Sequence, residues 1–190
     1  MDRIIDIVLP AIPQTLIMVI ASTIIALLIG LPLGIILTTT RPGGLTESLK
    51  VYSVLDGIIN ILRSFPFVIL MIVVFPLSRL IVGKSYGTAA MIIPLSVSAA
   101  PFVARLMEGY LIQVDSGIIE AAKSMGSSKR EIIFKVLIPE AMPMIVTGIT
   151  MTVINVIGYS AMAGVMGGGG LGDVANRYGY QRNEPLILSL

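Results

Sequence analysis

The sequence reads LIMVIASTIIALLIGLPLGIIL from Leu16 to Leu37, and no charged residue occurs anywhere between Asp6 and Arg41. A helix that crosses a bilayer needs about 20 consecutive apolar residues, because all of its backbone polar groups must be hydrogen-bonded within the helix. This stretch therefore predicts a membrane-spanning helix over about residues 14–38.

The composition of the whole chain extends this interpretation. Of the 190 residues, 55% are hydrophobic and only 13% are charged, whereas soluble domains carry roughly 25% charged residues. The chain lacks the polar side chains that a soluble fold needs on its surface, so lipid must cover much of it. We predict an all-α integral membrane protein, a polytopic helix bundle that forms a single domain over residues 1–190.

Other windows poor in charge predict further spans, at about 58–80, 86–110 and 141–164. The window at 58–80 is the least clear, because its charge-free part is short and Arg79 must reach the membrane interface. A fifth apolar stretch begins at 185–190, where the sequence stops. We interpret it as the start of a fifth span that is truncated here.

Several functional classes are excluded by what the sequence lacks. It contains no Cys and no His, which removes thiol nucleophiles, Cys/His zinc sites and imidazole bases. Ser160 therefore has no base with which to act as a protease nucleophile. The net charge of +2 is too small to indicate nucleic-acid binding, and no phosphate-binding loop for ATP occurs. We expect no catalytic residue, no cofactor and no metal site.

Lysines and arginines near the span ends indicate the orientation. They favour a cytoplasmic location for segments 41–63 and 105–140, which places the N-terminus outside. The most informative segment, 115–140, then lies in the cytoplasm.

Segment 115–140 has the pattern of two short helices. Asp115 or Ser116 can cap the first, and Gly126 can end it in a left-handed conformation. Ser128 and Glu131 have the spacing of a capping box that opens the second. The pattern predicts one apolar face on each helix, formed by Ile118, Ile119, Ala122 and Met125 on the first and by Ile132, Ile133, Val136 and Leu137 on the second. From these features alone the segment could be an amphipathic hairpin on the membrane surface.

The same segment resembles the EAA loop of bacterial ABC-importer permeases. The matching positions are Glu120, Ala121, Ala122, Gly126, Val136, Ile138 and Pro139, of which Val136 and Ile138 depart conservatively from the pattern. The resemblance implies a type I importer permease fold, in which this loop sits in a cleft of a separate ATP-hydrolysing subunit. The residues that it implies for coupling are Glu120, Ala121, Ala122, Met125, Gly126 and Pro139.

A narrower set of segments resembles the methionine-importer permease group. These segments are 63–67, 99–105, 158–164, 167–173 and 178–180. The resemblance implies five spans in a bacterial inner membrane, a homodimer, two ATPase subunits and an extracytoplasmic solute-binding protein. Alternatives are a permease for another amino acid or small solute, or an ion-coupled secondary transporter. The latter predicts ionisable residues at mid-span, and the windows at 14–38, 86–104 and 141–164 are poor in them.

Polar residues in the fourth window are candidates for the solute pathway. Asn155, Tyr159 and Met162 share one helix face, and Ser160 adjoins them. The alternative is that they pack and hydrogen-bond against a neighbouring helix.

Two further features have mainly structural interpretations. Arg105 and Glu108 have the spacing of an ion pair. The glycine-rich stretch 167–172 matches a dinucleotide fingerprint, but it lacks the strand that gives this pattern meaning. We expect it to be a flexible, tightly turned loop on the outer side, able to face an incoming binding protein.

Overall fold

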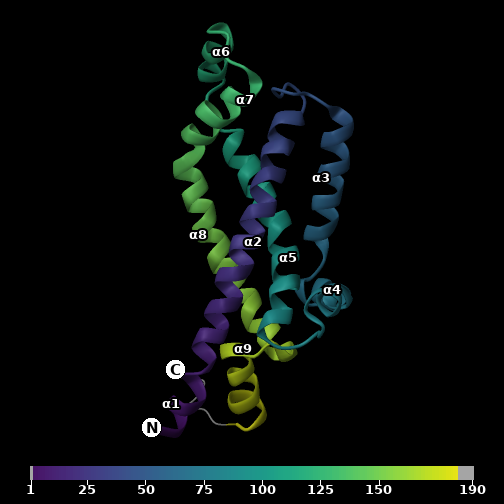
Figure 1. Cartoon of the computed structure of the whole chain (residues 1–190), viewed down its shortest axis with the longest axis vertical. Coiled ribbons are helices and arrows are strands. Elements are labelled where there is room, and N and C mark those ends of the chain that lie inside the picture. Colours follow the sequence, from purple (N-terminus) through teal and green to yellow (C-terminus); the bar gives the residue numbers. More distant parts are fainter. Residues whose placement is uncertain (1, 184–190) are drawn as a thin grey trace. The chain divides into compact units, whose positions relative to one another are not determined.

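The computed structural model describes residues 2–183, and over that range every regular element is helical (Figure 1). Three long helices dominate: α2 (Ala11–Thr40), α5 (Thr88–Leu111) and α8 (Ile138–Ala163). Each belongs to a helical run that is long and apolar enough to cross a membrane. The all-α fold is thus confirmed, while the expected start of a fifth span, at 185–190, lies outside the described residues.

The remaining elements are shorter. They are α1 (Asp2–Val8), α3 (Leu49–Ser64), α4 (Phe67–Val82), α6 (Ser116–Ser124), α7 (Lys129–Glu131), η1 (Ile132–Leu137), η2 (Gly164–Gly168), α9 (Gly170–Val174) and η3 (Ala175–Gln181). The segments η1 and η3 are π-helical, whereas Met166 and Gly167 in η2 are not helical, so that segment is a kink.

The span expected over 58–80 is interrupted by a break between two helices. The structure ends α3 at Ser64 and begins α4 at Phe67, with Pro66 in an extended conformation between them (φ −56°, ψ 136°). Proline has no N–H and disfavours a helical conformation of the residue before it, which is Phe65 here. The two helices would add a fourth membrane-crossing element to the three long runs if together they form one broken span.

The chain divides into two compact units where a single domain was expected. Unit 1 comprises residues 1–26, 65–99 and 153–190, and unit 2 comprises 27–64 and 100–152. Three long helices therefore contribute residues to both units.

Each unit has its own apolar core. In unit 1 the buried cluster consists of Met18, Phe67, Met71, Met91, Leu95 and Ala163. In unit 2 a smaller cluster joins Leu37, Ile59 and Ala104 from three different helices. Small residues such as Ala104 let helices approach closely, which is how helices associate where lipid replaces water.

Candidate functional site

The first helix of the predicted coupling loop, α6, has the ends that the sequence predicted. The Asp115 carboxylate accepts a hydrogen bond from the Gly117 N–H at 2.7 Å and so caps the first turn. The chain leaves the helix at Gly126, whose φ of +81° is a conformation that favours glycine. Both the beginning and the turn that follows α6 are therefore fixed by local chemistry.

The second helix of the loop opens on a complete capping box. The Glu131 N–H donates to the Ser128 hydroxyl at 3.3 Å, and the Glu131 carboxylate accepts from the Ser128 N–H at 3.1 Å. Lys135 completes the group with an ion pair to Glu131 at 3.0 Å. The Lys135 ammonium and then the Ser128 donors lower the pKa of Glu131 from 4.5 to about 2.

A π-helical turn, η1, connects this cap to α8. In it the N–H of Ile138 donates to the carbonyl of Ile133, one residue further back than in an α-helix. Pro139 follows directly, and a proline has no N–H to donate while its ring clashes with the carbonyl four residues earlier. The wider π-helical turn provides room for the proline ring and does not need the missing N–H. Pro139 is therefore accommodated by the shape of the chain at the end of the loop.

The faces of the two helices differ in how well the sequence predicted them. On η1 the predicted apolar stripe is confirmed, since Ile132 and Leu137 are buried and Ile133 and Val136 are half-buried. On α6 the single predicted face is wrong. Ala122 is buried, but Met125 is 78% exposed and Ile118 is 41% exposed.

The exposed surface of the loop therefore combines the Glu120 carboxylate with apolar side chains. Glu120 and Ala121 are exposed on α6, and Phe134 on η1 is 66% exposed, a feature the sequence analysis did not single out. Phe134 and Met125 are thus the most exposed large apolar side chains of this loop. Of the six predicted coupling residues, Ala122 is buried. The other five are exposed: Glu120, Ala121, Met125, Gly126 and Pro139.

The four predicted pathway residues of α8 have different environments in unit 1. The ring of Tyr159 stacks on that of Phe67, with centroids 4.4 Å apart and planes 2° from parallel. Met162 is 48% exposed. Asn155 is half-buried, and its Oδ1 has no hydrogen-bond partner among the described residues.

Ser160 lies in a different environment from Met162. It is 2% exposed, and its hydroxyl donates to the carbonyl of Ile157 in its own helix at 2.7 Å. The Ser160 hydroxyl is thus buried and bonded within α8, whereas Met162 on the same helix is exposed.

The glycine-rich segment is tightly turned, as expected, and it is hydrogen-bonded to α2. The N–H groups of Gly170 and Leu171 donate to the side chains of Gln14 and Thr15, at 2.7 and 2.9 Å. A Cβ atom on Gly172 would collide with the carbonyl oxygen of Ala161. The glycines allow backbone to approach backbone, which only a residue without a side chain permits.

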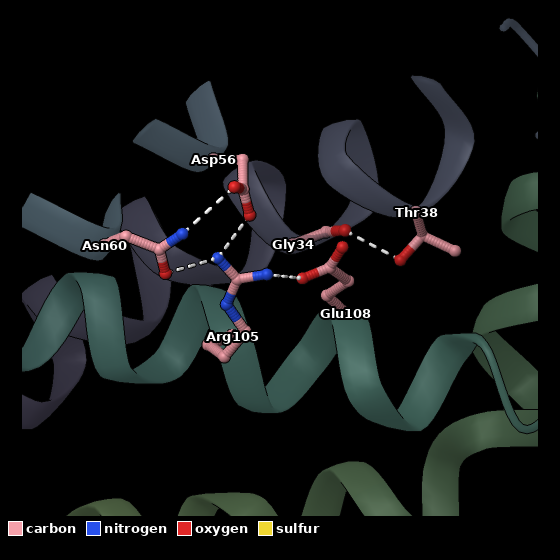
Figure 2. Close-up of polar contacts among 6 residues, drawn as sticks. All are labelled: Gly34, Thr38, Asp56, Asn60, Arg105 and Glu108. Atoms are coloured by element: carbon pink, nitrogen blue, oxygen red, sulfur yellow. Dashed lines mark hydrogen bonds and ion pairs between the residues drawn. The ribbon is translucent and has the colours of Figure 1, made fainter. Parts of the chain in front are cut away.

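The ion pair predicted between Arg105 and Glu108 is confirmed and belongs to a larger cluster in unit 2 (Figure 2). Its N–O distance is 2.6 Å, and the Glu108 side chain is 5% exposed. The same guanidinium contacts Asp56 at 2.6 Å and Asn60 at 2.9 Å, both from α3. Arg105 therefore joins α3 to α5, and Thr38 on α2 lies nearby with its hydroxyl bonded to the Gly34 carbonyl.

These features define the class. Long apolar helices, with polar clusters confined to a few positions, describe a multi-pass helical membrane protein of the permease kind. The chain belongs to the family of binding-protein-dependent transport system inner membrane components, whose model matches residues 30–190. It is accordingly an ABC-transporter permease of the inner membrane, a transport subunit rather than an enzyme.

Individual relatives agree with this assignment. The chain is 48% identical over 185 residues to the probable D-methionine transport system permease protein MetI of Vibrio cholerae, covering 97% of this chain and 82% of that protein. It is 46% identical over 151 residues to the D-methionine permease MetI of Escherichia coli, covering 80% of this chain and 70% of that protein. The resemblance to the methionine-importer permease group is confirmed.

Solved structures give the same result for the fold. A chain of the MetNI methionine ABC transporter in an inward-facing conformation has a TM-score of 0.93 and 42% identity, over 95% of this chain and 84% of that chain. An amino acid ABC transporter crystallised with histidines has a TM-score of 0.74 at 22% identity, over 95% of this chain and 82% of that one, which indicates a shared fold.

Proposed function

We propose that this chain forms the membrane pathway of an ATP-driven importer of methionine, and that it works as a homodimer with two ATPase subunits and an extracytoplasmic solute-binding protein. The observation that carries the solute assignment is 48% identity, over 97% of the chain, to a relative named as a D-methionine permease. The MetNI structure that this chain resembles supports the proposed ATPase partner.

The proposed route of coupling runs through α6. Its exposed Glu120, Ala121 and Met125 offer a carboxylate beside small and apolar surface, a combination suited to insertion into a groove of the ATPase. Gly126 and the capping box of Ser128 hold this helix at a fixed angle to the next. ATP-driven closure of the two ATPase subunits would then move α6, and with it the helices on which it is mounted.

The coupling proposal is tested by Ala121→Glu in the complex with the ATPase subunits. Ala121 is exposed, so the variant should insert and fold, whereas the same change at buried Ala122 would confuse folding with coupling. We expect ATP-dependent methionine uptake in proteoliposomes to fall about 100-fold, since a charge facing an apolar groove costs roughly 3 kcal/mol of affinity. Co-purification of the ATPase should fall in parallel.

Ala175→Glu is the matched control, because Ala175 is also an exposed alanine but lies in unit 1. It should leave ATPase co-purification unchanged. Normal uptake by the Ala121 variant would refute the role of α6 in coupling.

The solute pathway is tested separately with Met162→Ala. Met162 is 48% exposed on α8, and Met142 near the beginning of that helix is 46% exposed, so Met142→Ala removes an equally accessible thioether. If the pathway passes Met162, we expect the KM for methionine to rise about 3- to 10-fold in the Met162 variant alone, the size of one lost apolar contact. Equal KM values in both variants would remove Met162 from the pathway.

A further inference from the structure

Unit 2 contains a cavity of about 280 Å³ that α6 helps to line. Its walls come from the end of α2, the loop at residues 41–45, the end of α5, one side of α6 that includes Glu120 and Lys123, and η1. All of these segments belong to unit 2. The cavity therefore lies inside one compact unit and has the coupling helix as one of its walls.

The charged residues of this cavity favour an anion. Arg41 and Lys123 line it together with a single carboxylate, Glu120, which leaves an excess of one positive charge. The Nε of Arg41 is buried and has no hydrogen-bond partner within the part of the chain that the structure describes. Because that atom has almost no accessible surface, an anionic ligand in the cavity would instead contact the accessible part of the half-buried Arg41 side chain.

Two of the neutral side-chain donors around the cavity are already engaged. The hydroxyls of Thr38 and Thr39 donate to the carbonyls of Gly34 and Ile35 in their own helix, both at 2.9 Å. An anion in the cavity would therefore be bound mainly by the two cationic side chains. Charge-assisted hydrogen bonds of this kind are the stronger class.

Part of the cavity wall is apolar, with Leu111, Ile112 and Leu137 among its residues, and Thr38, Thr39 and Ser116 make another part polar. Cationic groups beside apolar walls fit a ligand with an anionic head and an apolar body. In the proposed topology the cavity opens on the cytoplasmic side, where basic pockets between membrane helices bind phospholipid head groups. We propose that this cavity binds the phosphate of an anionic phospholipid from the cytoplasmic leaflet.

Such a lipid would contact Arg41 at the end of α2 and Lys123 on α6 at the same time. Binding to one arrangement of these helices stabilises that arrangement. The ligand would therefore tie α6 to the membrane helix next to it. This last consequence depends on the proposed coupling role of α6, whereas lipid binding itself does not.

The test measures lipid retention by the purified full chain, independently of transport. The chain is equilibrated with phosphatidylglycerol or with phosphatidylcholine, and bound lipid is counted by native mass spectrometry. We expect selective retention of phosphatidylglycerol, with an affinity about 10- to 30-fold lower after Arg41→Gln plus Lys123→Gln, since each cation contributes roughly 1 kcal/mol.

Lys50→Gln plus Lys129→Gln removes the same charge from two exposed positions outside the cavity and should leave retention unchanged. Lys123→Gln alone changes only an exposed side chain and should lower the affinity about 5-fold, which preserves the test if the double variant does not fold.

Three outcomes would overturn the proposal. The first is equal retention of the two lipids. The second is loss of phosphatidylglycerol in the control variant to the same degree as in the cavity variant. The third is full displacement of the lipid by millimolar inorganic phosphate, which would identify a site for a free anion.

Discussion

Both compact units of this permease contain closely packed glycines, and unit 2 adds a cluster of charged side chains. In unit 1 the glycine-rich segment is joined to α2 by neutral hydrogen bonds from the backbone, and Gly172 lies against the Ala161 carbonyl. In unit 2 a single guanidinium, that of Arg105, joins α3 to α5 through two carboxylates. Close backbone packing tolerates no change of shape, whereas charged contacts can be exchanged for others at moderate cost. In unit 2 a Cβ atom on Gly34 would likewise collide with the Ala104 carbonyl, so the difference between the units is the charged cluster of unit 2, which also carries the proposed coupling helix.

The largest expected effect is that of Gly172→Ala, which tests the close packing of unit 1. The added Cβ collides with backbone at Ala161, and backbone cannot move aside as a flexible side chain would. We expect a loss of stability of about 3 kcal/mol, seen as a lower melting temperature and a lower yield of folded protein in detergent.

Gly158→Ala is the control for this variant, because nothing lies within 4 Å of a Cβ at that position. It should leave the melting temperature unchanged or raise it slightly, since alanine is the better helix former. Equal melting temperatures for the two variants would contradict the close packing of unit 1.

A smaller effect is expected from Arg105→Met in unit 2. The variant leaves Asp56 and the largely buried Glu108 without their cation. Losing one partner of a fully buried ion pair costs about 3–5 kcal/mol, but Arg105 is 27% exposed, so we expect about 2 kcal/mol here. The measurement is again the melting temperature.

Arg105→Lys keeps the positive charge but loses the planar guanidinium that contacts two carboxylates. Its stability should therefore lie between that of the wild type and that of Arg105→Met. If Arg105→Met melts at the wild-type temperature, the cluster does not hold unit 2 together.

The smallest effect concerns the ionisation of Glu131 in the capping box. Its pKa is lowered to about 2 in the folded protein, so its contribution to stability is complete above pH 4.5 and is lost as the pH falls towards 2. We therefore expect no change in the stability of this turn between pH 5 and 8, and a carboxyl titration with a midpoint near 2 by NMR.

The Lys135→Gln variant removes the main cause of the shift and should raise the midpoint of Glu131. Lys129→Gln is the matched control, because the ion pair that the structure gives Glu131 is with Lys135. A wild-type midpoint near 4.5 would mean that this capping group does not form.

Features set by short-range chemistry could be predicted from the sequence. The cap at Asp115, the turn at Gly126 and the ion pair of Arg105 with Glu108 each depend on residues within a few positions of one another. The fold class followed from the length of apolar stretches. The break before Phe67 could have been predicted from Pro66, but the hydropathy window averaged over it.

Features set by distant partners could not be predicted. The hydrogen bond from Gly170 is one, because its partner, Gln14, lies 156 residues away in the sequence. Asp56 is 49 residues from Arg105, and periodicity alone does not show that their helices meet. Met125 fits an apolar face by its spacing, yet α6 is too short to bury every apolar side chain and leaves it exposed.

The wide turn at η1 has one more consequence. A π-helical turn holds one residue more than an α-helical turn of the same span, so Ile132–Leu137 contains a spare residue. Deleting one residue from an ordinary helix rotates everything beyond it by about 100°. At η1 the same rotation would need no deletion, if the extra residue of the π-helical turn moved to another position in the helix. A shift of the π-helical turn along the chain would therefore rotate α8 relative to the capping box by one residue.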